Sequence, residues 1–148
     1  MLLRGISTLV NLKREINVTE QELDKFIEAV LTNEPFIQTY SIGTLKIVCQ
    51  SPNSKDYEEL GALSNKDEFE YAVIKAVLKE VSINDTIIYE KNDTCTDWKT
   101  YFADTIGKSP LQVLVLEKVV YFYNLFVKLL QELLAPDFFG KTKHTGRS

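Results

Sequence analysis

The sequence contains few of the residues that carry most enzyme chemistry. Its 148 residues include one histidine, His144, and two cysteines, Cys49 and Cys95, which do not form a CxxC pair. It contains no Walker phosphate-binding loop, no dinucleotide-binding glycine pattern, no G-x-S-x-G and no H-E-x-x-H motif. Structural and catalytic zinc sites need more Cys and His ligands than this chain offers. We therefore expect a protein that is not an enzyme and that holds no metal ion or other cofactor.

Glycine, proline and cysteine are also too scarce for some structural classes. Six Gly, four Pro and two Cys exclude collagen-like and disulfide-dense proteins. The hydrophobic fraction of 45% and the charged fraction of 26% are typical of a globular protein, and the length suits one domain. Two separated cysteines fit a reducing, intracellular setting. The apolar N-terminus is interrupted early by Arg4, so we expect no signal peptide.

Basic residues are scarce in the middle of the chain and gather at its two ends. Residues 1–14 carry three bases and no acid, and residues 138–148 carry three bases and no acid. The segment 15–137 holds 11 bases and 21 acids, a net charge of −10. Nucleic-acid binding depends on clustered Lys and Arg, so we expect no nucleic-acid partner. Either the basic ends dock on acidic surfaces of this or a neighbouring chain, or they are solvated ends with charge placed by chance.

The first half of the chain predicts a helix followed by a β-hairpin. Thr19 and Glu22 form a capping box, apolar residues recur at helical spacing up to Leu31, and Pro35 is expected to end the helix. Segments 36–42 and 45–50 flank Gly43-Thr44, which suits a type II′ turn that pairs Ile42 with Leu45. The residues expected on the apolar face are Phe36, Tyr40, Ile42, Leu45, Ile47 and Cys49.

Turn and capping residues divide the segment that follows. Ser54 is expected to cap a short helix to about residue 60, and Ser64 to cap another whose apolar stripe continues to Val81. A turn at 84–85 and a strand at 86–90 come next. A short helix after Thr96 then places three aromatic residues on one face and ends at Gly107, for which we expect positive φ. The three aromatic residues are Trp98, Tyr101 and Phe102.

The last predicted helix, about 110–134, is apolar on most sides. Its single narrow polar stripe consists of Glu117, Tyr121, Asn124, Lys128 and Gln131. Charged residues interrupt the helix, which argues against a membrane span, and we expect no membrane partner. Such a helix must be covered either by the rest of one chain or by another subunit, and we expect burial in an assembly.

These patterns predict an α+β fold that is mostly helical, with several helices, a β-hairpin or small antiparallel sheet and a long apolar C-terminal helix. We expect an N-terminal arm (1–17), a single domain (18–140) and a basic C-terminal tail (141–148). Aromatic and aliphatic residues of the arms and of the last helix are the expected anchors at interfaces, with basic residues at the rim. The predicted partner-binding residues are Leu2, Leu3, Ile6, Leu9, Phe122, Leu125, Phe126, Leu129, Phe138, Phe139, Lys141, Lys143 and Arg147.

The order of features resembles that of small proteins encoded among the tail genes of tailed bacteriophages, including tail assembly chaperone-like and baseplate-hub assembly proteins. The resemblance covers about residues 18–140. It rests on the capped helix, on Glu34-Pro35-Phe36 leading into the hairpin, on the polar segment SKDYEELGAL from Ser54, and on the aromatic end at 136–140. Some relatives carry a Cys pair of metal-ligand type that this chain lacks.

The resemblance implies a non-enzymatic structural or assembly protein of the virion, assembled in the host cytoplasm, in or near the tail, baseplate or neck. Its partners would be other phage structural proteins, either copies of itself or neighbouring subunits. The acidic body also suggests an alternative: a small regulatory module that blocks a host or phage nucleic-acid enzyme by occupying its basic cleft.

Overall fold

The computed structural model describes residues 18–92, 94–107 and 110–134. Over these residues the chain is an α+β domain, mostly helical, as predicted. The elements in chain order are α2 (Glu20–Thr32), β1 (Ile37–Ile42), β2 (Leu45–Gln50), α3 (Ser54–Ala62), α4 (Lys66–Val77), β3 (Leu78–Ile83), β4 (Thr86–Glu90), α5 (Trp98–Thr105) and α6 (Leu111–Leu134).

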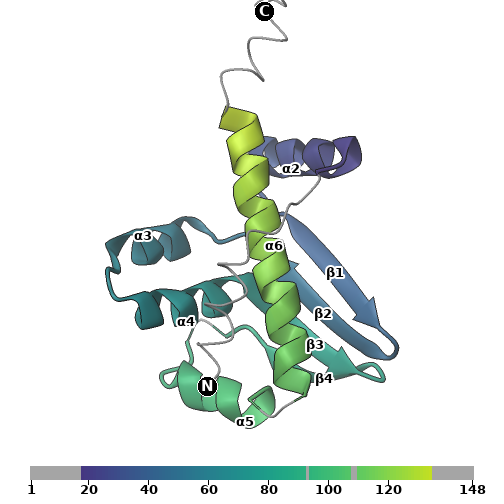
Figure 1. Cartoon of the computed structure of the whole chain (residues 1–148), viewed down its shortest axis with the longest axis vertical. Coiled ribbons are helices and arrows are strands. Elements are labelled where there is room, and N and C mark those ends of the chain that lie inside the picture. The colour runs from purple at the N-terminus through teal and green to yellow at the C-terminus, as the bar shows by residue number, and fades with distance from the viewer. Residues whose placement is uncertain (1–17, 93, 108–109, 135–148) are drawn as a thin grey trace, which may run out of the picture.

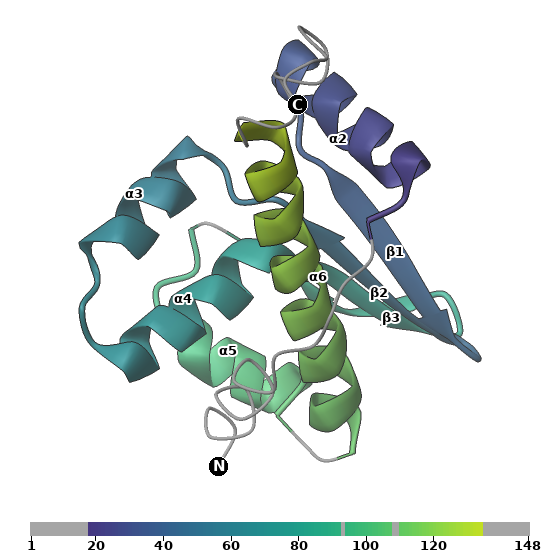
Figure 2. The ribbon, with the colours of Figure 1, turned by 45° about the horizontal axis from the view of Figure 1, so that its top comes forward.

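The four strands form one antiparallel sheet in the order β1-β2-β3-β4, so β1 and β4 are its edges. α6 crosses one face of the sheet, with α4 beside it and α2 near its C-terminal end (Figures 1 and 2). α5 lies next to β4. The sheet therefore has one face against helices and one face that carries mostly polar residues.

The helix and hairpin predicted in the first half are confirmed. The Thr19 hydroxyl accepts from the Glu22 N–H at 3.1 Å, and the Glu22 carboxylate accepts from the Thr19 N–H at 3.1 Å. The helix ends before Pro35, because Asn33 takes a left-handed conformation with φ +58°. Gly43 has φ +62°, the sign that a type II′ turn requires at its first position, and Ile42 pairs with Leu45 as expected.

Two predicted helix caps are wrong by one residue. The cap of α3 is Asn53, whose side chain accepts from the Asp56 N–H at 2.8 Å, and not Ser54. The cap of α4 is Asn65, which accepts from the Glu68 N–H at 3.0 Å, and not Ser64. In each case two neighbouring residues are good caps, and the asparagine places its side-chain oxygen at the N–H of the third helical residue.

The stripe expected to continue to Val81 is interrupted by a change from helix to strand. α4 ends at Val77 and β3 begins at Leu78 with no residue between them. Val81 is buried, but as a strand residue paired with Ile47 and Tyr89. The strand conformation of residues 78–83 is determined by the pairing of β3 with β2. The helical spacing of apolar residues in this part of the sequence gives no sign of that pairing.

Gly107 does not take the positive φ predicted for it, and among the described glycines only Gly43 does. The need for glycine here is one of space, because a Cβ at Gly107 would lie 2.5 Å from the Ala103 carbonyl oxygen. The rest of this segment is as expected: α5 follows Thr96, and Trp98 and Phe102 are both buried.

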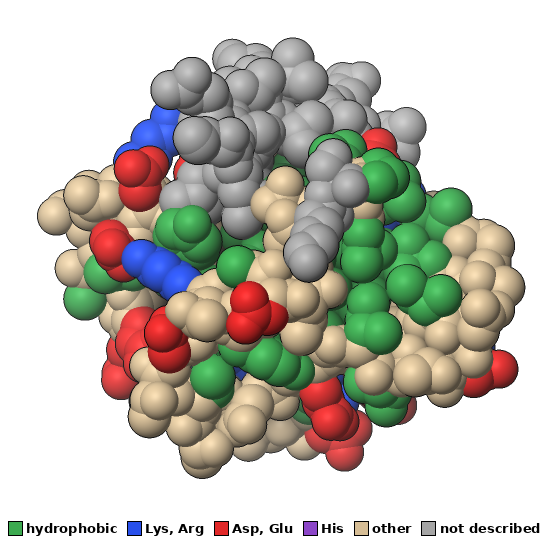
Figure 3. All heavy atoms as spheres, turned by 90° about the horizontal axis from the view of Figure 1, so that it is seen from below, with side chains coloured by type: hydrophobic (Ala, Val, Ile, Leu, Met, Phe, Trp, Pro, Cys, Tyr) green, Lys and Arg blue, Asp and Glu red, His purple; other side chains and the backbone are tan. Residues whose placement is uncertain are grey.

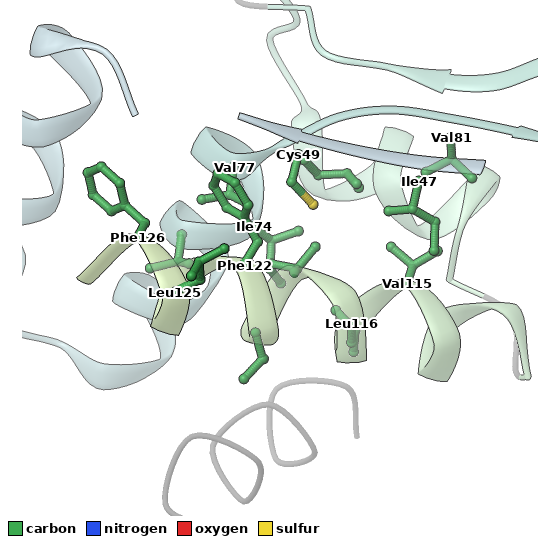
Figure 4. Packing of buried hydrophobic residues seen from close by; sticks show 14 of the residues in the cluster. Ile47, Cys49, Ile74, Val77, Val81, Val115, Leu116, Phe122, Leu125 and Phe126 are labelled. Carbon is green, nitrogen blue, oxygen red and sulfur yellow. The ribbon is translucent and has the colours of Figure 1, made fainter. Parts of the chain in front are cut away.

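The hydrophobic core lies between the sheet and the helices α4 and α6 (Figure 4). Phe36, Leu45, Ile47 and Cys49 are buried as predicted for the apolar face of the hairpin. Tyr40 is half-buried on the same face, whereas Ile42 at the end of β1 is 37% exposed.

Candidate functional site

Four residues predicted as partner contacts, Phe122, Leu125, Phe126 and Leu129, lie in the core of the chain itself. Each of these α6 side chains is at most 4% exposed. Phe122 stacks on Phe36 at 5.8 Å between ring centres, and Phe126 contacts the ring of Phe26 edge-on at 5.9 Å. Because the same chain already covers these side chains, their assignment to an interface is corrected to a core role.

The expectation that α6 is buried in an assembly rather than within one chain is corrected for the same reason. The sheet, α4 and α2 all contact this helix. Val113 and Leu134, near its two ends, are its exposed large hydrophobic residues. The remaining predicted partner-binding residues lie outside the described residues, and they are Leu2, Leu3, Ile6, Leu9, Phe138, Phe139, Lys141, Lys143 and Arg147.

The two edges of the sheet differ in how they are protected. At the β4 edge, the Tyr101 hydroxyl accepts from the Glu90 N–H at 2.9 Å and donates to the Glu90 carbonyl oxygen at 3.2 Å. The register shift in the β3–β4 ladder and the charge of Glu90 further disfavour the addition of a strand here. The β4 edge is therefore closed by a side chain of α5.

Within the described part of the chain, the β1 edge has none of these protections. Its six residues, Ile37–Ile42, include no charged residue, no proline and no glycine. Its pairing with β2 is regular along its whole length. Proteins usually protect a sheet edge with charges, proline or a bulge, and a regular uncharged edge is a site for the addition of another strand.

The main-chain groups that β1 leaves free can be identified from its register. A two-residue loop makes Ile42 and Leu45 a hydrogen-bonded pair, and such pairs alternate along an antiparallel ladder. The Ser51 N–H donates to the Phe36 carbonyl at 2.9 Å, which fits this alternation. The N–H and C=O groups of three residues therefore point away from β2, and no hydrogen bond joins them to another described residue. These residues are Ile37, Thr39 and Ser41.

Apolar side chains gather at the end of the sheet where the hairpins turn. In the view from below, hydrophobic side chains cover much of the right-hand side (Figure 3), which is the side of the hairpin turns in Figure 1. Ile42 at the end of β1, Ile87 in β4 and Val113 in the first turn of α6 are each exposed, by 37%, 51% and 57%. A partner strand on β1 would therefore lie next to one exposed apolar side chain of the strand end, Ile42.

Tyr40 marks the boundary between this edge and the core. Its ring lies edge-on to Tyr121 at 6.0 Å, and the Lys118 ammonium lies 5.7 Å from the ring centre. Its hydroxyl is buried and has no hydrogen-bond partner among the described residues. Burial raises the pKa of Tyr40 well above its usual value, with Cys49, Tyr121 and Glu22 adding to the effect. The tyrosine is therefore neutral. Tyr40 and Lys118 lie next to the β1 edge on the face of the sheet that the helices cover.

A nearly buried ion pair elsewhere in the chain has a structural role. The Lys91 ammonium lies 3.7 Å from the Asp56 carboxylate, and the two side chains are 10% and 13% exposed. Lys91 also donates to the Lys75 carbonyl at 2.9 Å, while Asp56 accepts from the Asn53 N–H at 3.2 Å. The pair thus joins the end of β4 to α3 and α4, and its groups are already engaged.

Two surface pockets offer no reactive arrangement. The larger, about 570 Å³, is lined by residues 33–35 and 50–55. The smaller, about 310 Å³, lies between α3, α4 and α5, where Lys99 sits 4.5 Å from the Tyr71 ring centre and 3.3 Å from the Glu68 carboxylate. The described residues contain no group of three or more His, Cys, Asp or Glu side chains placed to hold a metal ion. None of the described helices is long and apolar enough to cross a membrane.

The β1 edge was not predicted from the sequence, although part of its signal is there. The uncharged run 37–42 is visible in the sequence. Its position at an edge depends on the strand order, and that order depends on β3, which helical spacing concealed. Comparison with known proteins finds no family model that matches the sequence, no curated protein of significantly similar sequence and no solved structure of significantly similar fold.

Proposed function

We propose that this protein is a non-catalytic subunit or assembly factor that acts through protein–protein contacts in or near the tail, baseplate or neck of a tailed-phage particle. The observation that carries the protein-contact part of the proposal is the free β1 edge. It offers three N–H and three C=O groups to a partner strand, on a segment without charge. Strand addition of this kind derives its affinity from main-chain hydrogen bonds and its specificity from alternate side chains.

The phage context of the proposal rests on the resemblance described above. In that context the protein would assemble in the host cytoplasm and bind other phage structural proteins. The concentration of bases in residues 1–14 and 138–148, on a body of net charge −10, adds ends that suit acidic neighbouring surfaces. The two features would act together, with β1 fixing the orientation of the subunit and the basic ends guiding its encounter with neighbours.

The test is to infect cells with the source phage and to measure the copy number of this chain in purified particles and tail intermediates by quantitative mass spectrometry. We expect a fixed copy number in at least one of these fractions. Incorporation of a Thr39→Pro variant is expected to fall, because proline removes one of the N–H groups that face outward from β1. A chain absent from all particle and tail fractions contradicts the proposal.

The same experiment separates the alternative function from this one. A regulatory module that blocks a nucleic-acid enzyme would co-purify with a polymerase or nuclease rather than with tail proteins. Such a complex would be expected to weaken steeply with salt, because acidic side chains on a basic cleft form mainly electrostatic contacts.

A further inference from the structure

We propose that a second copy of this chain is the strand partner of β1, in an antiparallel arrangement whose twofold axis passes through Thr39. This inference rests on the proposed function, because it names one partner for the β1 edge. The result would be a continuous sheet of eight strands, with the β4 edges at its two ends.

The composition of β1 makes it suitable for pairing with itself. In a twofold arrangement each residue meets a residue of the same segment, so a charged residue near the axis would face a like charge. Ile37–Ile42 contains no charge, although the chain as a whole carries 21 acids and 17 bases. The β4 edge carries Glu90 close to its closing side chain, Tyr101, and so lacks this property.

The positions of the free main-chain groups determine the register. Between two copies, hydrogen-bonded pairs can form only between residues whose N–H and C=O groups point away from β2. In each copy these residues are Ile37, Thr39 and Ser41. An axis through Thr39 pairs Ile37 with Ser41 of the second copy and Thr39 with Thr39 of the second copy. All three outward residues of each copy then take part, which gives six hydrogen bonds. Moving the axis by one residue in either direction leaves only two such pairs within β1.

The side chains are compatible with this register. Thr39 would face its own copy on the polar side of the sheet, and Thr–Thr pairs across antiparallel strands are favourable. On the helix side, Gln38 would lie opposite Tyr40 of the second copy. Tyr40 is held there by its contacts with Tyr121 and Lys118.

Cysteine cross-linking tests the axis directly, in the full-length chain with Cys95→Ser as background. The second native thiol, Cys49, is fully buried and does not interfere. Thr39→Cys is expected to give a disulfide-linked dimer under mild oxidation, because Cα atoms of a hydrogen-bonded pair lie about 5.5 Å apart, within the range of a disulfide. Ser41→Cys, on the same strand and face, is the matched control. Its two copies would lie four residues apart along the strands, about 13 Å, and should not cross-link.

Each outcome of this experiment decides the proposal. Cross-linking by Thr39→Cys and not by Ser41→Cys supports the axis. Equal cross-linking by both variants indicates random collision and overturns it, as does the absence of cross-linking in both. A disulfide formed only when the two variants are mixed would place the axis at Tyr40 and would also overturn it.

Sedimentation equilibrium of chains without added cysteine gives a second, independent measurement. Thr39→Val keeps the N–H group and loses only the Thr–Thr contact, so its dimer dissociation constant is expected to stay within about fivefold of that of the unmodified chain. Thr39→Pro is expected to raise the dimer dissociation constant by at least about tenfold, because it removes the central pair of hydrogen bonds. The far-ultraviolet circular dichroism spectrum of this variant should match that of the unmodified chain, because the lost N–H points away from β2 and the fold does not depend on it. Equal dissociation constants for the proline and valine variants contradict the proposal.

Failure of this inference can be told apart from failure of the proposed function. A chain that stays monomeric, but whose entry into particles still depends on Thr39, has a different strand partner, and the proposed function stands. If the chain dimerises through Thr39 but is absent from particle and tail fractions, the dimer proposal stands and the proposed phage function is wrong.

Discussion

Replacing Leu125 by glutamate tests whether α6 is the centre of the core of one chain. Leu125 lies in the middle of the helix and is 0% exposed. Removing a buried leucine side chain alone costs about 2–5 kcal/mol of unfolding free energy. The new carboxyl would be buried, and burial that raises its pKa by about 3 units adds about 3.4 kcal/mol at pH 7.

The total loss should be a large part of the stability of the protein. A chain of this length has an unfolding free energy of about 7–15 kcal/mol. We expect Leu125→Glu to lose at least about 5 kcal/mol, which lowers the urea midpoint by about 2.5 M for a slope of about 2 kcal/mol/M. Urea titration followed by far-ultraviolet circular dichroism measures this midpoint.

The pH dependence identifies the charge contribution. The unfolded glutamate has a pKa of about 4.3 and the folded one a higher pKa, so the charge penalty is complete above the folded pKa and disappears below about pH 4.3. The stability difference from the unmodified chain should therefore narrow as the pH falls from 7 to 4. Val113→Glu is the matched control, since Val113 is 57% exposed in the first turn of the same helix, where an acid is favourable. A loss below about 1 kcal/mol in Leu125→Glu, or a difference that does not change with pH, would refute the core assignment.

Three further predictions concern other parts of the core. Gly107→Ala should lower the melting temperature by several degrees because its Cβ would clash with backbone, whereas Gly61→Ala, which has open space, should leave it equal or higher. Tyr89→Phe should cost about 1–3 kcal/mol in a urea titration, because the Trp98 indole N–H, which donates to the Tyr89 hydroxyl at 2.8 Å, would lose its partner in a buried site. Burial raises the pKa of the Cys49 thiol well above its usual value, so at pH 8 a thiol reagent should modify only the other, half-buried cysteine in the native chain and both in urea. Rapid modification of both thiols in the native chain would contradict this burial.

The elements that were predicted correctly are those set by short-range chemistry. The reciprocal bonds of Thr19 and Glu22 involve residues three apart, and the Gly43 turn fixes the hairpin register through its immediate neighbours. In both cases the interacting groups lie within a few residues of one another, so the sequence pattern contains the whole interaction.

The elements that were missed depend on partners far along the chain. Val81 continues a helical stripe from α4, yet its environment is set by Ile47 in β2, 34 positions away. The coverage of α6 likewise depends on which distant elements reach it, and the pattern within the helix does not show that the sheet, α4 and α2 all do. The β1 edge could not be predicted either, because a strand can be identified as an edge only when the positions of all the other strands in the sheet are known.

The direct junction between α4 and β3 restricts how the gene can change in length. A single-residue insertion or deletion at 77–78 would turn α4 by about 100° relative to β3 or exchange the two faces of the strand. Val81 would then leave the position between Ile47 and Tyr89, and Ser82 after a deletion, or Glu80 after an insertion, would take its place. β4 and α5 are instead separated by residues 91–97, where Lys91 forms an ion pair and Asn92 accepts from the Thr94 N–H at 3.0 Å, so neither element continues directly into the other. Natural length variants of this protein should therefore gain or lose codons within 92–96, and the codons for 77 and 78 should stay adjacent.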